Sequence, residues 1–383
     1  MKLRIAILAD PVLKALAGAP AGRGDGQAAT WLPHFARELF LEEDLEVTWI
    51  SLRRGIQKTI QTPWERHQFI EIPGIPITLD VLTGYALVAR RLRQVVDEVK
   101  PDILHCWGTE GPYSALLGYR DIPSFLSMNG ILGELKTKQI LPLGWRWKLQ
   151  TALEKKWLAK ADRISTESEW ACDAVHRIHP NAPTEVVPYG VNPSFYEIEW
   201  QPDPDDPFIF FAGTVNKGKG VDVLLNAIES LPQRSWRCEI AGDGPLRNPL
   251  EARATPGVTW LGTLDWKAFQ QKLSKAWCLV LPTLADSNPN VVKEARVAGL
   301  PVITTIHGGQ AGYLKNDGNA MILDQINPSA LAAALQQMME GGCEKIRKMG
   351  AFGHREDRDR FQSSHTVTGF KKIYEDLARN AAR

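Results

Sequence analysis

Residues 281–305 read LPTLADSNPNVVKEARVAGLPVITT. This stretch predicts a buried strand that ends at Pro282, a polar loop, a helix from about Pro289 to Gly299, and a second strand over 302–305. The order places the N-terminus of a helix at the carboxyl end of a parallel strand. Ligands of α/β sheets bind at such positions, because free backbone N–H groups point out of the first helical turn.

Two acidic residues in this stretch follow the spacing acid-x7-acid. Glu294 lies one to two turns into the predicted helix, where its carboxylate can accept both hydroxyls of a ribose. Asp286 lies in the loop, where it can hold sugar hydroxyls. Plainer interpretations stay open: Asp286 can help to cap the helix, whose expected cap is Asn288 or Ser287, and an acid is favoured in an early turn.

The rest of the chain repeats this alternation of short apolar runs and helical patterns, which is typical of doubly wound α/β sheets. The predicted strands are residues 4–8, 46–51, 69–72, 103–106, 124–128, 163–166, 184–187, 208–211, 237–241, 278–281 and 302–305. The predicted helices include 79–99, 145–160, 220–230, 289–299 and 366–382, the last with an apolar stripe of Phe370, Ile373, Tyr374 and Leu377.

The segment WQPDPDDP, residues 200–207, separates two such halves. Its prolines and aspartates exclude a core element, so it predicts a linker over 197–207 between domains at 1–196 and 208–365. The Asp-x-Asp within it matches the metal-binding signature of one class of sugar transferases. Proline-rich linkers collect aspartate for turns and solubility, and we expect no metal site.

The composition is that of a soluble globular protein, with 44% hydrophobic and 23% charged residues in a chain of 383. A net charge of +1 gives no reason to expect a nucleic-acid partner. The five cysteines form no CxxC pair, which favours a reducing compartment. The N-terminal apolar run ends at Asp10, too early for a signal peptide. We therefore expect a cytoplasmic protein.

Residues 281–305 resemble the donor-site motif of glycosyltransferase family 4, E-x7-E followed by A-x-x-x-G-x-P-V. Asp286 stands for the first Glu, and the matching positions are Glu294, Ala295, Gly299, Pro301 and Val302. Further segments resemble family landmarks in the same order. They are DILHCWGTEGP (102–112), STESEWACDAV (165–175), VVPYGVNPSFY (186–196), FFAGTVNKGKGVDVLLNAI (210–228), IAGDGP (240–245) and HGG (307–309).

The resemblance implies a retaining transferase with the GT-B fold: α/β, with two Rossmann-like doubly wound domains facing across a cleft and helix 366–383 packing back on the first. Its donor would be a nucleotide-diphosphate sugar, and its acceptor a glycan, a lipid-linked molecule or a small molecule. No metal and no separate cofactor are expected. The implied catalytic residues are Lys219, Asp286 and Asn129. The implied donor-binding residues are Gly26, Gly213, Lys217, Lys219, Asn290, Val291 and Glu294.

Two positions depart from the family pattern. Asn129 stands where many members have a histidine, and an asparagine cannot act as a general base near neutral pH. Thr214 stands where an arginine is usual, which makes Lys217 a second candidate beside Lys219 for contacting the diphosphate. His105 and Glu110 are acceptor-side candidates, although His105 also suits a structural role.

Residues 144–163, GWRWKLQTALEKKWLAKADR, predict an amphipathic helix with a basic face. Such a helix can rest on the inner face of an anionic membrane and meet a lipid-linked acceptor. It can equally be a core helix with a solvated basic face, and the sequence favours this second interpretation.

Three functions remain in view. An active retaining transferase in cell-surface polysaccharide or glycoconjugate synthesis is supported by the donor motif. A non-catalytic GT-B scaffold that binds a partner or nucleotide is supported by Asn129 and Thr214. A sugar-nucleotide epimerase would need acid–base groups around the donor sugar, and the first domain shows no evident set.

Overall fold

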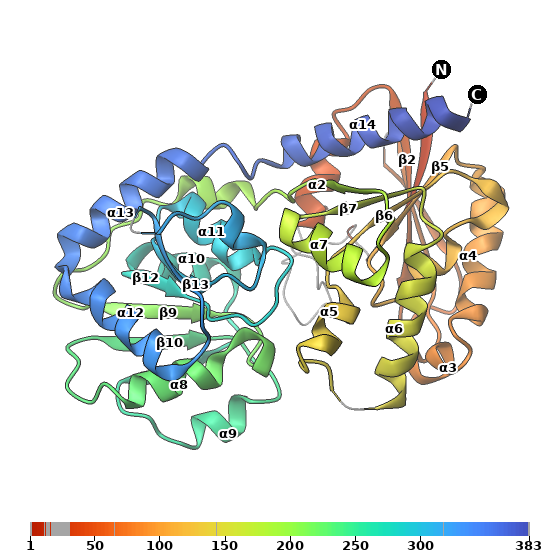
Figure 1. Ribbon diagram of the computed structural model, residues 1–383. Coiled ribbons are helices and arrows are strands. Elements are labelled where there is room, and N and C mark those ends of the chain that lie inside the picture. The colour runs from red at the N-terminus through yellow and green to blue at the C-terminus, as the bar shows by residue number, and fades with distance from the viewer. Residues whose placement is uncertain are drawn as a thin grey trace. The chain divides into compact units, whose positions relative to one another are not determined.

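The computed structural model describes residues 2–10, 12, 16, 31–64, 66–142, 144–316 and 318–381, apart from the side chains of residues 77 and 356. The chain forms two compact units (Figure 1). The first unit comprises Met1–Gly190 and Ser363–Arg383, and the second comprises Val191–Gln362. Within the described ranges, no helix combines the length and the apolar character needed to cross a membrane.

The first unit contains a sheet with the strand order β3-β4-β2-β1-β5-β6-β7-β8. Only β3 runs antiparallel to its neighbour, and the other pairs are parallel. The side chains of β5 are all buried, because a parallel strand is covered on both faces. The strands are β1 (Leu3–Leu8), β2 (Leu45–Arg53), β3 (Ile60–Trp64), β4 (His67–Pro73), β5 (Ile103–Trp107), β6 (Ser124–Ser127), β7 (Arg163–Thr166) and β8 (Thr184–Val186).

Helices cover this sheet, and the C-terminal helix is one of them (Figure 1). The α-helices are α2 (Leu32–Leu39), α3 (Ile77–Leu82), α4 (Ala86–Val99), α5 (Leu132–Thr137), α6 (Trp145–Leu158), α7 (Glu169–Ile178) and α14 (Ser363–Ala381). Helix α14 packs on α2, β5 and β6. Its predicted apolar stripe is buried there: Phe370, Ile373, Tyr374 and Leu377 are at most 4% exposed.

Two predicted helices of the first unit differ from the structure. Residues 79–99 form two helices, because Gly84 and Tyr85 adopt positive φ angles of 56° and 65° and interrupt the helical hydrogen bonds. Within residues 144–163, only Trp145–Leu158 form α6, Arg163 begins β7, and the helix is not amphipathic as predicted. Its buried side includes the polar Gln150 and Glu154, whereas Trp145 in its first turn is 53% exposed.

The second unit contains a parallel sheet with the order β11-β10-β9-β12-β13-β14. The strands are β9 (Phe208–Ala212), β10 (Arg237–Ala241), β11 (Val258–Gly262), β12 (Cys278–Val280), β13 (Val302–Thr305) and β14 (Ala320–Leu323). The α-helices are α8 (Val221–Glu229), α9 (Arg247–Glu251), α10 (Trp266–Lys275), α11 (Asn290–Ala298), α12 (Pro328–Glu340) and α13 (Gly342–Asp357). The apolar run FIFFA of β9 is buried at the centre of this sheet.

Residues 197–207 contain no helix or strand beyond the end of the short turn Pro193–Glu197. They run along the second unit. The Trp200 indole donates to the carbonyl of Ala276 at 2.8 Å, and the Trp277 indole donates to the carbonyl of Asp203 at 2.6 Å. The segment is therefore irregular in backbone but fastened to the second core.

Candidate active site

The strand order of the second unit changes direction between β9 and β12. From β9 the chain adds β10 and β11 on one side, and from β12 it adds β13 and β14 on the other. The loops that follow β9 and β12 therefore diverge at the carboxyl edge of the sheet. Ligands of open α/β sheets bind at such a switch point, and the predicted donor residues follow these two strands.

Hydrogen bonds join the loops after β9, β12 and β13 into one framework. The Thr283 hydroxyl and the Leu284 N–H both donate to the carbonyl of Gly218, at 3.0 and 2.8 Å. The Thr305 hydroxyl donates to the carbonyl of Thr283 at 2.6 Å. The Gly309 N–H donates to the carbonyl of Asp286 at 3.0 Å. Because each loop is tied to the next, their side chains occupy fixed positions.

Gly220, at the start of α8, is required by this packing. Its φ angle is 68°, a conformation that side chains disfavour, and an added Cβ would lie 2.0 Å from the carbonyl oxygen of Pro282. The loop after β9 can therefore approach the loop after β12 only with a glycine at this position.

Lys219 and Asp286 meet in this framework. The Lys219 ammonium donates to a carboxylate oxygen of Asp286, with the two side chains 26% and 15% exposed. The lysine comes from the short turn Lys217–Lys219 after β9, and the aspartate comes from the loop after β12. A cation is thus held beside the switch point with part of its surface open to a ligand.

Glu294 lies on α11 and has no hydrogen-bond or ion-pair partner among the described residues, although it is only 7% exposed. Burial raises its pKa to about 7, against a smaller opposing effect of the Lys293 charge. Asn290, in the first turn of the same helix, has a buried side-chain oxygen without a partner. Such unpartnered polar groups are costly unless a ligand satisfies them.

The raised pKa of Glu294 predicts a pH-dependent stability. Its folded pKa of about 7 exceeds the ordinary 4.5. The folded state therefore binds more protons between these values, and stability falls as pH rises through this window. Replacing Glu294 by Gln should remove this contribution. Between pH 5 and pH 8 the free energy of unfolding of wild type should therefore fall by about 2–4 kcal/mol relative to that of Glu294→Gln. Urea denaturation of both proteins at the two pH values measures this change. A difference in the free energy of unfolding that is the same at both pH values would contradict the prediction.

The remaining donor-side residues are distributed as follows. Gly213 and Lys217 flank the loop after β9, with Lys217 exposed, and Val291 packs partly against the core beside Asn290. Gly26 lies outside the described residues. The expected caps Asn288 and Ser287 do not cap α11. The helix begins one residue later than predicted, so Pro289 itself is the N-cap and no side chain caps the helix.

The first unit holds Glu110 and Asn129 on neighbouring loops at the carboxyl edge of its own sheet, after β5 and β6. The exposed Glu110 carboxylate accepts from the Gly130 N–H at 2.6 Å. The Trp107 indole donates to the side-chain oxygen of Asn129 at 3.1 Å. The amide group of Asn129 is thus oriented by the core, and the carboxylate is oriented beside it.

The expectation that His105 faces an acceptor is wrong. The side chain has no exposed surface, and its two ring nitrogens hydrogen-bond to the hydroxyls of Tyr374 and Ser127, each at 2.7 Å. Burial lowers its pKa well below the ordinary value. His105 is therefore a neutral core residue that connects β5 to α14.

The sequence analysis did not identify Glu154 of α6, which organises the same edge of the first unit. Its buried carboxylate accepts from the N–H groups of Leu132 and Gly133, at 2.9 and 2.7 Å, and from the Thr109 hydroxyl at 2.6 Å. It therefore caps α5 and ties the loop after β5 to the loop after β6. Only its place in a lysine-rich helix is visible in the sequence.

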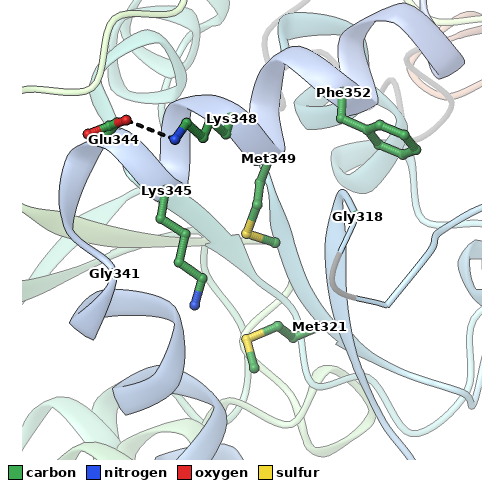
Figure 2. A pocket seen from close by; sticks show the side chains of 8 residues that line it. All are labelled: Gly318, Met321, Gly341, Glu344, Lys345, Lys348, Met349 and Phe352. Atoms are coloured by element: carbon green, nitrogen blue, oxygen red, sulfur yellow. Dashed lines mark ion pairs between the residues drawn. The ribbon is translucent and has the colours of Figure 1, made fainter.

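A pocket of about 680 Å³ lies elsewhere in the second unit (Figure 2). It is lined by Gly318, Met321, Gly341, Glu344, Lys345, Lys348, Met349 and Phe352. Gly318 precedes β14, and this strand is parallel to β13. The pocket therefore adjoins the amino end of β14, at the opposite edge of the sheet from Lys219, Asp286 and Glu294, and it is not part of their site.

Comparison with known proteins agrees with this geometry. Residues 34–195 match the family model described as Glycosyltransferase Family 4. Residues 195–355 match the model described as Glycosyl transferases group 1. The chain belongs to glycosyltransferase family 4. The sequence resemblance is thereby confirmed.

This member of family 4 is similar to several curated proteins. It is 26% identical over 178 residues to an uncharacterized glycosyltransferase of Methanocaldococcus jannaschii, covering 45% of this chain and 49% of the relative. It is 27% identical over 248 residues to D-inositol 3-phosphate glycosyltransferase of Nocardia farcinica, covering 58% and 54%. A putative teichuronic acid biosynthesis glycosyltransferase of Bacillus subtilis is 30% identical over 131 residues, covering 34% and 32%. The matches thus span about half the length of these relatives or less.

Solved structures show the fold of this member of family 4. Sucrose-phosphate synthase from Thermosynechococcus elongatus has a TM-score of 0.80 at 17% identity, over 100% of both chains. A glycosyltransferase involved in lipopolysaccharide biosynthesis has a TM-score of 0.71 at 14% identity, over 97% of this chain and 99% of the other. The predicted fold class, α/β with two Rossmann-like domains in the GT-B arrangement, is confirmed.

Proposed function

We propose that this family 4 protein is an active retaining glycosyltransferase that moves a sugar from a nucleotide-diphosphate sugar to a glycan, lipid-linked or small-molecule acceptor. The observation that supports this most directly is the buried, unpartnered Glu294 carboxylate on α11, the helix that follows the loop in which Asp286 pairs with Lys219 at a topological switch point. The similarity to a relative named for teichuronic acid biosynthesis favours a role in cell-surface polysaccharide or glycoconjugate synthesis.

The donor-side residues can perform distinct tasks. Hydroxyls of a ribose can donate to the Glu294 carboxylate and so satisfy a group that the fold leaves without a partner. Lys219 can stabilise the diphosphate as negative charge develops on it, and the N–H groups in the first turn of α11 add a positive end of a helix dipole. Asp286 can hold Lys219 in position and accept from sugar hydroxyls. These groups need no metal and no separate cofactor.

The acceptor-side chemistry rests on the first unit. Asn129 can orient a sugar by hydrogen bonding but cannot remove a proton. In a front-face retaining transfer the leaving phosphate can accept the proton of the acceptor hydroxyl, so an asparagine at this position is compatible with activity. Glu110, exposed beside it, is the acceptor-side carboxylate.

A donor-binding experiment tests the proposal. UDP-, GDP- and ADP-sugars are added to wild type, Glu294→Ala and the control Glu344→Ala, and the melting temperature is measured. Glu344 is a matched control because its side chain is 83% exposed and pairs with Lys348 on α13. At about 100 times the dissociation constant a ligand adds roughly 2.7 kcal/mol of stability. We expect a shift for one nucleotide class, kept in the control and lost in Glu294→Ala.

The same panel contains the contradicting result. If no nucleotide sugar shifts the melting temperature of folded wild type, the donor site does not exist and the chain is a binding scaffold. If Glu294→Ala retains the full shift, the donor lies elsewhere. A donor that binds and is turned over without any acceptor into an epimeric nucleotide sugar would identify an epimerase.

A further inference from the structure

Exposed large apolar side chains gather at one place on the first unit. Leu79, Leu82, Leu87 and Trp145 are 46%, 62%, 42% and 53% exposed. They are half of the eight exposed large hydrophobic residues found in the described part of the chain. Scattered single residues of this kind need no explanation, but a cluster marks an interaction surface. We refer to these four residues as the leucine–tryptophan surface.

The elements that carry this surface contact one another. Leu79 and Leu82 lie on α3, Leu87 is the second residue of α4, and Trp145 begins α6. Helix α3 packs against both α4 and α6. The Tyr85 hydroxyl, just before α4, donates to the side-chain oxygen of Gln150 on α6 at 2.7 Å. Figure 1 shows α3 beside the ends of α4 and α6. The four side chains therefore belong to one end of the unit.

Basic residues flank the apolar side chains in the sequence, and the acidic residues of α4, Asp97 and Glu98, lie at the end of the helix that is far from Leu87. Residues 81–96 contain Arg90, Arg91 and Arg93 and no acidic residue. Residues 135–153 contain Lys136, Lys138, Arg146 and Lys148 and likewise no acidic residue. The nearby Asp80 of α3 is 5% exposed, and burial raises its pKa to about 6. The exposed charges around the apolar side chains thus favour an anionic partner.

The surface lies on the same edge of the sheet as the acceptor-side loops. Gln150 of α6 donates to the carbonyl of Thr109 at 2.6 Å, one residue before Glu110. The carboxylate of Glu154, one turn later, holds the loops after β5 and β6. Trp145 precedes both residues, so it lies farther out along α6, beyond the carboxyl edge. The leucine–tryptophan surface thus adjoins Glu110 and Asn129 through two buried side chains.

We propose that the leucine–tryptophan surface docks on an anionic lipid bilayer and that the acceptor of the proposed transfer is lipid-linked. A cluster of exposed apolar side chains flanked in the sequence by lysine and arginine suits the interface of such a bilayer, where the apolar side chains enter the acyl boundary and the charges meet anionic headgroups. The docking element is the end of α6 together with α3 and α4, not the face of a helix over 144–163. The acceptor part of this inference rests on the proposed function.

Vesicle co-sedimentation tests the docking. Wild type, the double variant Leu82→Gln/Trp145→Gln and the control Leu41→Gln are mixed with phosphatidylcholine vesicles with or without phosphatidylglycerol. Leu41 is a matched control because it is 69% exposed and lies between α2 and β2, at the amino edge of the sheet. We expect wild type and control to bind the anionic vesicles, more weakly at high salt, and the double variant to bind at least about tenfold more weakly.

Two results would overturn the docking: no binding of wild type to anionic vesicles, or equal binding of the double variant in protein shown to be folded by circular dichroism. A wild type that self-associates or needs an added protein to bind vesicles would also overturn it, in favour of a protein interface. The donor-induced thermal shift, measured on the same variants without vesicles, reports on the proposed function separately. Failure of the one experiment therefore leaves the other interpretable.

Discussion

Lys219→Ala should lower kcat by about 10²–10³, with a smaller change in KM. Removing one preorganised donor that stabilises developing charge costs a transferase about 2.7–4 kcal/mol of transition-state stabilisation. The charge on the diphosphate grows as the bond to the sugar breaks, so the lysine contributes more to the transition state than to donor binding. Its pairing with Asp286 holds the ammonium at the switch point before the donor arrives.

Steady-state kinetics in which the donor concentration is varied separates the effect on kcat from the effect on the KM for the donor. Lys219→Arg should recover part of the rate, because it restores the charge but with a different geometry. Lys348→Ala is the matched control, since that lysine is 76% exposed on α13 and pairs only with Glu344 in the described contacts. A Lys219→Ala protein with unchanged kcat and a raised KM would show that Lys219 binds the ground state alone.

The central strands were predictable from the sequence because a parallel strand covered on both faces is a continuous apolar run. The predictions over 163–166, 237–241 and 302–305 coincide with β7, β10 and β13. The edge strand β8 was predicted at 184–187, whereas the edge strands β3, β11 and β14 were missed. The side chains of β3 alternate between exposed and half-buried positions, and β11 has a single fully buried residue at its end. Neither strand produces an apolar run.

The association of Lys219 with Asp286 follows from two short segments whose strands are neighbours in the sheet. The motif placed each residue just after a strand, and the order of β9 and β12 brought the two loops together. The environment of His105 could not be predicted in this way. Its partner Tyr374 lies 269 residues away on a helix whose docking position no local pattern specifies.

The sequence analysis also did not predict a buried ion pair between α11 and α13. Arg296 of α11 and Asp357 at the end of α13 are both fully buried, and the guanidinium donates to the carboxylate at 3.0 Å. The residues are 61 positions apart. In the sequence, Arg296 is indistinguishable from a solvated helix residue, because its burial depends on how α13 packs against α11.

Gly353→Ala should destabilise the second unit by about 3–5 kcal/mol, because the new methyl group would displace this guanidinium. A Cβ at position 353 would lie 1.0 Å from a terminal nitrogen of Arg296. The side chain cannot move aside cheaply, since it also donates to the carbonyl of Leu300 and has no exposed surface. Separating a buried pair leaves an uncompensated charge, which carries a cost of this size.

Urea denaturation measures the change, with Gly312→Ala as the control because a Cβ there meets no atom within 4 Å. The cause is tested by adding Gly353→Ala to Arg296→Met. Arg296→Met alone should be destabilising, because it removes the buried guanidinium that pairs with Asp357, but it also vacates the space that the methyl group needs. The two losses should therefore sum to clearly more than the loss of the double variant. Strict additivity would mean that Gly353 is needed for the backbone of α13 and not for the guanidinium that packs against it.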